Sequence, residues 1–223
     1  KRTKYRHVPR ASRYQRNQNT CGLSMPPFDE AGLIKAAKRG NLTAFNQLVL
    51  QYQGFAYNVA YRILGDGDLA ADVTQESFIK AYKAMDQFRG GSFRAWLARS
   101  VTNTCYDVLR RKQRRPADSL EDLSVDPEHA MRLQSPQESP ESYALRAELS
   151  ELIQRSIDQL PPDQRVTLVL ADIQGMSYQE IADMTGVSLG TVKSRLSRAR
   201  ARLRDILLEH KELLPYPYRL SSE

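Results

Sequence analysis

Apolar residues fall at helical spacing through most of the sequence, and no stretch alternates in the manner of a β-strand. Between residues 41 and 64 the apolar positions lie three or four residues apart, at Phe45, Leu48, Val49, Tyr52, Val59 and Ile63. This spacing places them on one face of a helix. Similar patterns stand on both sides of a polar, proline-rich stretch at residues 116–142. We therefore predict an all-α protein with two small helical domains.

The first domain, residues 29–115, is predicted to be a four-helix bundle whose helices are separated by capping and turn residues. Gly40 closes the first helix, Asn41 caps the second, Asp68 caps the third, and Ser92 opens the fourth after Gly90-Gly91. The fourth helix carries an inward stripe, with Trp96 interpreted as core: Phe93, Trp96, Leu97, Val101, Cys105 and Val108. Pro116 stops this helix.

The second domain, residues 143–208, is predicted to end in a helix-turn-helix. Tyr178, Ile181 and Ala182 share one face of a short helix. Gly186 supplies the backbone freedom of a sharp corner, and Ser188 can cap the helix that follows. That helix carries one apolar stripe, formed by Val192, Leu196, Ala199 and Leu203.

The remaining faces of this last helix are basic, and no acidic residue precedes Asp205. Like charges at helical spacing repel one another unless an anion lies opposite. A solvated basic helix on an ordinary bundle would also show this pattern. The capped corner favours a helix that enters the DNA major groove, where Lys and Arg meet guanine edges and phosphates.

The net charge and the composition also indicate an anionic partner. The chain has 223 residues, a net charge of +7 and a pI near 9.5. Residues 1–28 form a basic arm without acids, which either binds phosphates loosely or is a solvated tail. Residues 116–142 carry seven acids against one arginine, which is typical of a flexible linker. Residues 209–223 are expected to be a frayed tail.

No constellation for catalysis is apparent, so we expect neither an enzyme nor a bound cofactor or metal. The three histidines, His7, His129 and His210, fall in the arm, the linker and the tail. Cys21 and Cys105 lack the companions of a zinc site or a disulfide framework. With no apolar run of about 20 residues, no membrane insertion is expected, and we predict a cytoplasmic protein.

Two stretches resemble the extracytoplasmic-function sigma factors, a group within the bacterial sigma-70 family. Residues 72–82, DVTQESFIKAY, with residues 88–97, FRGGSFRAWL, and Thr102-Asn103 are similar to sigma region 2. Residues 160–203 resemble region 4. The resemblance implies a transcription initiation factor that binds core RNA polymerase, recognises −35 and −10 promoter elements and promotes strand opening.

The family likeness also implies partners and contact residues. Asp72, Gln75 and Glu76 would bind the coiled coil of the largest polymerase subunit, although a solvated acidic patch is the alternative. Region 4 would meet the flap of the second-largest subunit, and an anti-sigma factor is a further expected partner. The −35 element would be read by residues of the last helix: Lys193, Ser194, Arg195, Ser197, Arg198, Arg200 and Arg202.

For the −10 element, the resemblance implies capture of an unstacked base by the loop at residues 88–92. Lys80 and Asn103 match polar positions of the pocket, and stacking on an aromatic ring offsets the cost of extruding a base. Phe88 either supplies that ring or is an ordinary core residue. Arg89, Arg110 and Arg111 are the basic residues expected beside the melted strands.

Two other functions remain possible from the residues alone. One is a helix-turn-helix regulator that acts without polymerase and uses its first domain to sense a ligand or to dimerise. Such a protein binds duplex operators by itself, often as a dimer on half-sites about one helical turn apart. The other is an enzyme that acts on nucleic acids.

Overall fold

The computed structural model describes residues 28–114 and 140–210, and every regular element in these ranges is a helix. The first module holds α1 (Glu30–Lys38), α2 (Leu42–Leu64), α3 (Gly67–Lys83), the short η1 (Met85–Gln87) and α4 (Phe93–Arg114). The second holds α6 (Pro140–Asp158), α7 (Pro162–Leu168), η3 (Val169–Ile173), α8 (Tyr178–Thr185) and α9 (Leu189–Glu209). The predicted all-α class is confirmed.

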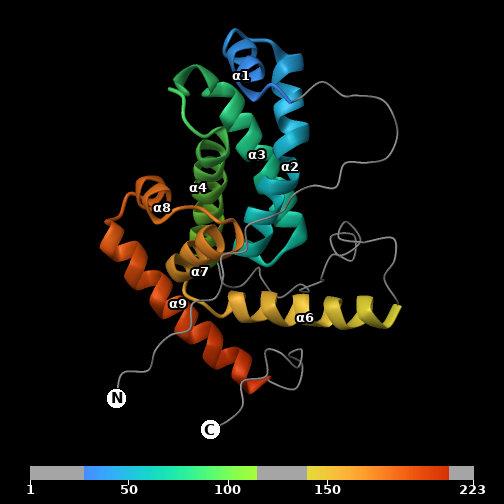
Figure 1. The fold of residues 1–223 in the computed structure, drawn as a ribbon, viewed down its shortest axis with the longest axis vertical. Coiled ribbons are helices and arrows are strands. Elements are labelled where there is room, and N and C mark those ends of the chain that lie inside the picture. The colour runs from blue at the N-terminus through green and yellow to red at the C-terminus, as the bar shows by residue number, and fades with distance from the viewer. Residues whose placement is uncertain (1–27, 115–139, 211–223) are drawn as a thin grey trace.

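Helices α2, α3 and α4 stand side by side, and α1 packs against α2 at the end of the bundle far from α6 (Figure 1). Helix α6 begins at Pro140, inside the stretch predicted as linker. Apart from residues 28, 140–142, 209 and 210, the predicted arm, linker and tail lie outside the described residues.

Short polar side chains fix the starts of the helices. Asn41 accepts a hydrogen bond from the amide of Ala44 at 3.0 Å, and Ser92 accepts one from that of Ala95 at 3.1 Å, as the sequence predicts. The prediction for α3 was wrong, because Asp66 is the cap and accepts from the amide of Leu69 at 2.9 Å. Gly67 already belongs to the helix, which places Asp68 in its first turn.

The core of the first module is built from the predicted apolar faces. Leu48, Val59, Ile63, Phe93, Leu97 and Val101 are fully buried. Trp96 is half-buried against this core, and Cys105 lies within it. Burial raises the pKa of the Cys105 thiol to about 12, so it has no thiolate character near neutral pH.

The two modules share one continuous core in the described residues. Helix α6 packs on α2, while α7 and α8 pack on α4 (Figure 1). Thr102 of α4 lies with its hydroxyl 3.8 Å from the sulfur of Met184 in α8, and both residues are buried. Arg94 of α4 donates to the carbonyl of Gln174 at 2.8 Å. The sequence predicts both modules but not their contact.

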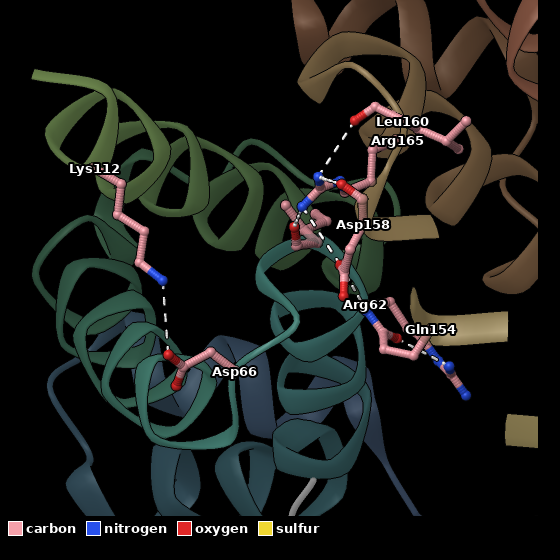
Figure 2. Close-up of polar contacts among 8 residues, drawn as sticks. Arg62, Asp66, Lys112, Gln154, Asp158, Leu160 and Arg165 are labelled. Atoms are coloured by element: carbon pink, nitrogen blue, oxygen red, sulfur yellow. Dashed lines mark hydrogen bonds and ion pairs between the residues drawn. The ribbon is translucent and has the colours of Figure 1, made fainter. Parts of the chain in front are cut away.

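A polar clasp joins the second module to the C-terminal end of α2 (Figure 2). Arg165 of α7 donates to the carbonyl oxygens of Ile63, at 2.8 Å, and of Asp158. Its guanidinium also pairs with the Asp158 carboxylate at 3.5 Å. Arg62 donates to Gln154 at 3.0 Å. Arg165 thereby gives a hydrogen-bond partner to the carbonyl of Ile63, which lies in the last turn of α2 and has no partner within the helix.

Gly65 makes room for this clasp. It ends α2 with φ of 71°, and a Cβ at this position would lie 2.6 Å from a carboxylate oxygen of Asp158. Burial raises the pKa of Asp158, and the opposite charge of Arg165 is the largest influence against that rise. Burial likewise lowers the pKa of Arg165. The charge of each side chain therefore offsets the free-energy cost of burying the charge of the other.

Candidate nucleic-acid interface

Helices α8 and α9 form the predicted helix-turn-helix. Ser177 and Glu180 make a reciprocal capping box at the start of α8, and this hydrogen bonding lowers the pKa of Glu180. Gly186 turns the corner with φ of 69°, and Ser188 accepts from the amide of Thr191 at 3.1 Å. Both predicted turn residues are confirmed.

Helix α9 is anchored by its apolar stripe and exposes most of its basic side chains. Val192, Leu196 and Ala199 are buried, and Leu203 packs at the edge of the core. Five of the predicted −35 residues are exposed, namely Lys193, Ser197, Arg198, Arg200 and Arg202. Ser194 is half-buried and donates to the carbonyl of Thr191 at 3.0 Å. An open hollow of about 570 Å³ beside this face includes Tyr178, Lys193 and Ser197.

Two of the predicted −35 arginines are held by carboxylates of the same module. Arg200 donates to both oxygens of Asp172, at 2.9 and 2.6 Å, and this hydrogen bonding raises the pKa of Arg200. Arg195 forms an ion pair with Asp163. The helix carries no acid before Asp205, and these partners come from η3 and α7, 28 and 32 residues earlier. No local spacing could have revealed them.

In the first module, Lys80 and Asn103 come from neighbouring helices. Lys80 donates to the hydroxyl of Thr104 at 3.1 Å and pairs with Glu76 at 2.8 Å. Asn103 precedes Thr104 on α4 and is exposed. The ammonium of Lys80 therefore lies over the stretch of α4 that carries the Asn103 amide.

The loop at residues 88–92 presents backbone rather than an aromatic ring. Phe88 is only 4% exposed, and its ring lies 5.9 Å from that of Phe93 and 5.4 Å from that of Trp96. The core alternative for Phe88 fits this position. Its carbonyl accepts a hydrogen bond from Lys38 at 2.7 Å. Gly90 and Gly91 adopt φ of 98° and 86°, and Arg89 is exposed.

The basic end of α4 is solvent-exposed. Arg110 and Arg111 are both exposed, and Arg110 makes only a long contact of 3.9 Å with Asp107. Lys112 points instead to Asp66, at 3.7 Å (Figure 2). Ion pairs of this length on an exposed surface contribute little stabilisation, so Arg110 and Arg111 remain available to bind phosphates.

The predicted polymerase-binding residues lie along α3. Asp72 and Gln75 are exposed, whereas Glu76 is half-buried and is the partner of Lys80. Gln75 also lines a groove of about 680 Å³ between α2 and α3. Leu42 and Ile79 line the same groove with 55% and 48% of their surface exposed. The apolar pattern of the sequence does not predict this groove, because Ile79 falls off the inward stripe of α3.

Residues 28–114 and 140–210 contain no group of three His, Cys, Asp or Glu side chains placed to hold a metal ion. Among the helices in these ranges, none is both long and apolar enough to cross a membrane.

Known protein families match both modules. The family model for sigma-70 region 2 matches residues 48–115, and that for sigma-70 region 4 matches residues 150–203. The chain is 41% identical over 173 residues to the RNA polymerase sigma-H factor of Pseudomonas aeruginosa, covering 75% of this chain and 88% of that protein. It is 39% identical over 173 residues to the ECF RNA polymerase sigma-E factor of Escherichia coli, with the same coverage.

A longer relative is the ECF RNA polymerase sigma factor SigE of Mycolicibacterium smegmatis. It is 37% identical over 169 residues, which cover 76% of this chain and 63% of SigE. Two solved structures share the fold. The sigma factor RpoE of Bartonella quintana, in complex with the anti-sigma factor NepR, has a TM-score of 0.59 and 27% identity over 74% of this chain and 98% of that one. CnrH, in complex with the cytosolic domain of CnrY, has a TM-score of 0.55 and 31% identity over 78% and 94%.

Fold, helix-turn-helix and family matches together define a protein with sigma-70 regions 2 and 4. The chain belongs to the extracytoplasmic-function sigma factors of RNA polymerase.

Proposed function

We propose that this sigma factor reads the −35 element with α9 and the −10 element with the face shared by α3 and α4. The observation that carries the proposal is the capped, core-anchored α9, which holds Lys193, Arg198 and Arg202 in solvent. A helix of this kind enters the major groove, where arginine recognises guanine and lysine neutralises phosphate. Ser194, Arg195, Ser197 and Arg200 flank these side chains on the same helix.

The proposed role of the first module is to hold opened −10 DNA. Lys80 and Asn103 offer donors and an acceptor to a base edge, while Arg89, Arg110 and Arg111 offer charge to the backbone. A base inserted beside the loop would meet the aromatic cluster of Phe88, Phe93 and Trp96 only if the loop moves, because Phe88 is buried. The supporting features are the exposed side chain of Asn103 and the hydrogen bond that Lys80 donates to Thr104, the next residue of α4.

Core RNA polymerase is the proposed partner of α3. Asp72 and Gln75 are exposed beside a groove with apolar walls, a combination that suits a helical partner with basic and apolar side chains. In this proposal the partner is the coiled coil of the largest subunit, and the second module contacts the flap of the second-largest subunit. Action with polymerase would place the protein in the cytoplasm.

An anti-sigma factor is a further proposed partner. The Bartonella quintana relative was solved in complex with the anti-sigma factor NepR, and the fold match covers 74% of this chain. A binding role of this kind, rather than catalysis, is in keeping with the family.

The decisive experiment is run-off transcription with purified core RNA polymerase, followed by sequencing of the start sites. We expect transcripts that begin downstream of a common pair of −35 and −10 sequences, and co-elution of this chain with the core enzyme. A regulator that acts without polymerase would instead protect duplex operators tightly by itself. Strong footprints without polymerase, together with no co-elution, would overturn the proposal.

A further inference from the structure

Arg200 is held along one edge of its guanidinium by a carboxylate from another element. Its Nε and Nη2 atoms donate to the two oxygens of Asp172 at 2.9 and 2.6 Å. A guanidinium carries five N–H donors in one plane, and this side-on pair leaves three of them unused by the carboxylate. The side chain of Arg200 stays 52% exposed in the pair. Asp172 therefore fixes the arginine without covering it.

Asp172 lies in a widened turn of the chain. In η3 the amide of Gln174 donates to the carbonyl of Val169 at 3.0 Å, which closes a π turn over five residues. Such turns are rare and occur frequently at functional sites. Val169 and Leu170 bury their side chains in the core and anchor the turn. The carboxylate of Asp172 therefore reaches α9 from a rigid base.

Arg200 shares one face of α9 with two other polar residues. Lys193, Ser197 and Arg200 follow one another at steps of four and three residues, which places them in a row along the helix. The row spans about 10 Å at 1.5 Å per residue. All three border the hollow of about 570 Å³, together with Tyr178 of α8. The fixed guanidinium therefore lies beside residues proposed to meet the −35 duplex.

We propose that Asp172 is a positioning residue for DNA, which holds the guanidinium of Arg200 ready to bind one backbone phosphate of the −35 duplex at this hollow. The inference rests on the proposed reading of the −35 element by α9. A phosphate accepts two N–H donors of an arginine side by side, and three donors of Arg200 are left for it. A long side chain loses conformational freedom when it binds, and Asp172 removes part of that freedom before DNA arrives.

The same ion pair has a competing interpretation with the opposite outcome. A carboxylate beside DNA repels phosphates, and an arginine that it neutralises is lost to binding. If Asp172 only stabilises the second module, its removal frees Arg200 and tightens DNA binding. If Asp172 positions Arg200, its removal weakens DNA binding even though the chain becomes more positive. The sign of the change in affinity decides between the two.

Asp172→Asn measures this sign in the full chain assembled with core RNA polymerase, with a fluorescent promoter duplex as the probe. Asparagine keeps one acceptor oxygen and replaces the other with an NH₂ group, which cannot accept from a guanidinium. We expect the dissociation constant to rise by about threefold to tenfold, as measured by anisotropy. Asp183→Asn is the matched control, because Asp183 is exposed on α8 and accepts from Gln179 rather than from an arginine. It loses the same charge and should bind no more weakly than wild type.

Arg200→Met provides a second test, because it removes the guanidinium and leaves Asp172 in place. The slope of log affinity against log salt should fall by about one, as expected for one lost phosphate contact. In this background Asp172→Asn has no arginine to misplace, so it should no longer weaken binding. Urea unfolding of the two single variants and the double variant identifies the conditions in which all three are folded.

Tighter binding by Asp172→Asn than by wild type would overturn the inference. Weaker binding that persists in the Arg200→Met background would also overturn it, since Asp172 would then act through the fold alone. An unchanged salt slope for Arg200→Met would exclude the phosphate contact. The proposed function fails separately, if the wild-type complex with core enzyme binds a duplex with the −35 element no better than one in which that element is scrambled.

Discussion

At the scale of single residues, exposed arginines on α9 differ in what they are expected to read. Arg198 lies nearer the start of the helix than Arg202, and both are exposed. The N-terminal part of a recognition helix contacts base edges, whereas its later part approaches the backbone. We predict that Arg198→Ala loses about 1 to 3 kcal/mol at one defined −35 base pair. Arg202→Ala should weaken all duplexes alike.

Salt titrations separate these two effects. Loss of one phosphate contact lowers the slope of log affinity against log salt by about one, so Arg202→Ala should flatten that slope. Arg198→Ala should instead reduce discrimination between base pairs at one position, measured with a set of single-substituted duplexes. Uniform losses for both variants on every duplex would contradict the assignment.

Asn103 is the residue on which strand opening is expected to depend. Its exposed amide can hydrogen-bond to the edge of an extruded base only after the base pair has opened. We predict that Asn103→Ala slows initiation more on a fully duplex promoter than on a template already mismatched at the −10 element. Permanganate footprinting with core enzyme measures the opening directly. An identical deficit on both templates would argue against a role in melting.

At the scale of elements, Ser188 allows the stability of α9 to be separated from its contact with DNA. The Ser188 cap accepts from the amide of Thr191, and alanine at such a position costs about 1 kcal/mol. Aspartate caps as well as serine but places a negative charge at the end proposed to face phosphates. We predict that Ser188→Ala lowers stability and largely retains −35 affinity. Ser188→Asp should retain stability and lower −35 affinity.

Urea unfolding and −35 duplex binding measure the two quantities on the same preparations. Weaker DNA binding by Ser188→Asp than by Ser188→Ala would place the start of α9 beside the duplex. Comparable binding by both variants would indicate that this end of the helix points away from DNA.

Local sequence signals predicted the elements well because their causes are local. The cap Ser188, the corner Gly186 and the stripe of Val192 and Leu196 act within one or two turns, and all three are confirmed. Asp68 was the wrong cap because the run Gly65-Asp66-Gly67-Asp68 offers two acids as caps, and Asp66 is the one that accepts from the amide of Leu69.

Contacts between residues far apart in the sequence could not be predicted, and the reason is physical. The partner of Arg195 is Asp163, 32 residues away, and one partner of Arg165 is the backbone carbonyl of Ile63, 102 residues away. Which carboxylate or carbonyl meets which arginine depends on the packing of the modules, and no periodicity encodes it. The roles of Lys80, Asn103 and Asp72 in binding remain predictions.

At the scale of the whole molecule, the Arg165 clasp should couple the stability of the two modules. The Arg165 side chain is 11% exposed and the Asp158 side chain 26%, so removal of the arginine leaves a mostly buried carboxylate without its ion-pair partner. Arg165→Met keeps much of the apolar volume and should cost about 2 to 3 kcal/mol near neutral pH, less than a fully buried pair would. Arg155→Met, on the exposed side of α6, is the matched control and should cost little.

The pH dependence of this loss follows from the charge on Asp158. Burial already raises the pKa of Asp158 in the folded protein, and loss of Arg165 removes the largest opposing influence, so the pKa rises further in the variant. A carboxyl whose pKa is higher when folded binds a proton preferentially in the folded state, so the stability of the variant falls as pH rises from the unfolded pKa through the folded one. The destabilisation by Arg165→Met should therefore be smaller at mildly acidic pH, where Asp158 is neutral, than at pH 7. Urea unfolding of wild type, Arg165→Met and Arg155→Met across that window measures it, and a loss that is independent of pH would show that Arg165 acts through its backbone hydrogen bonds alone.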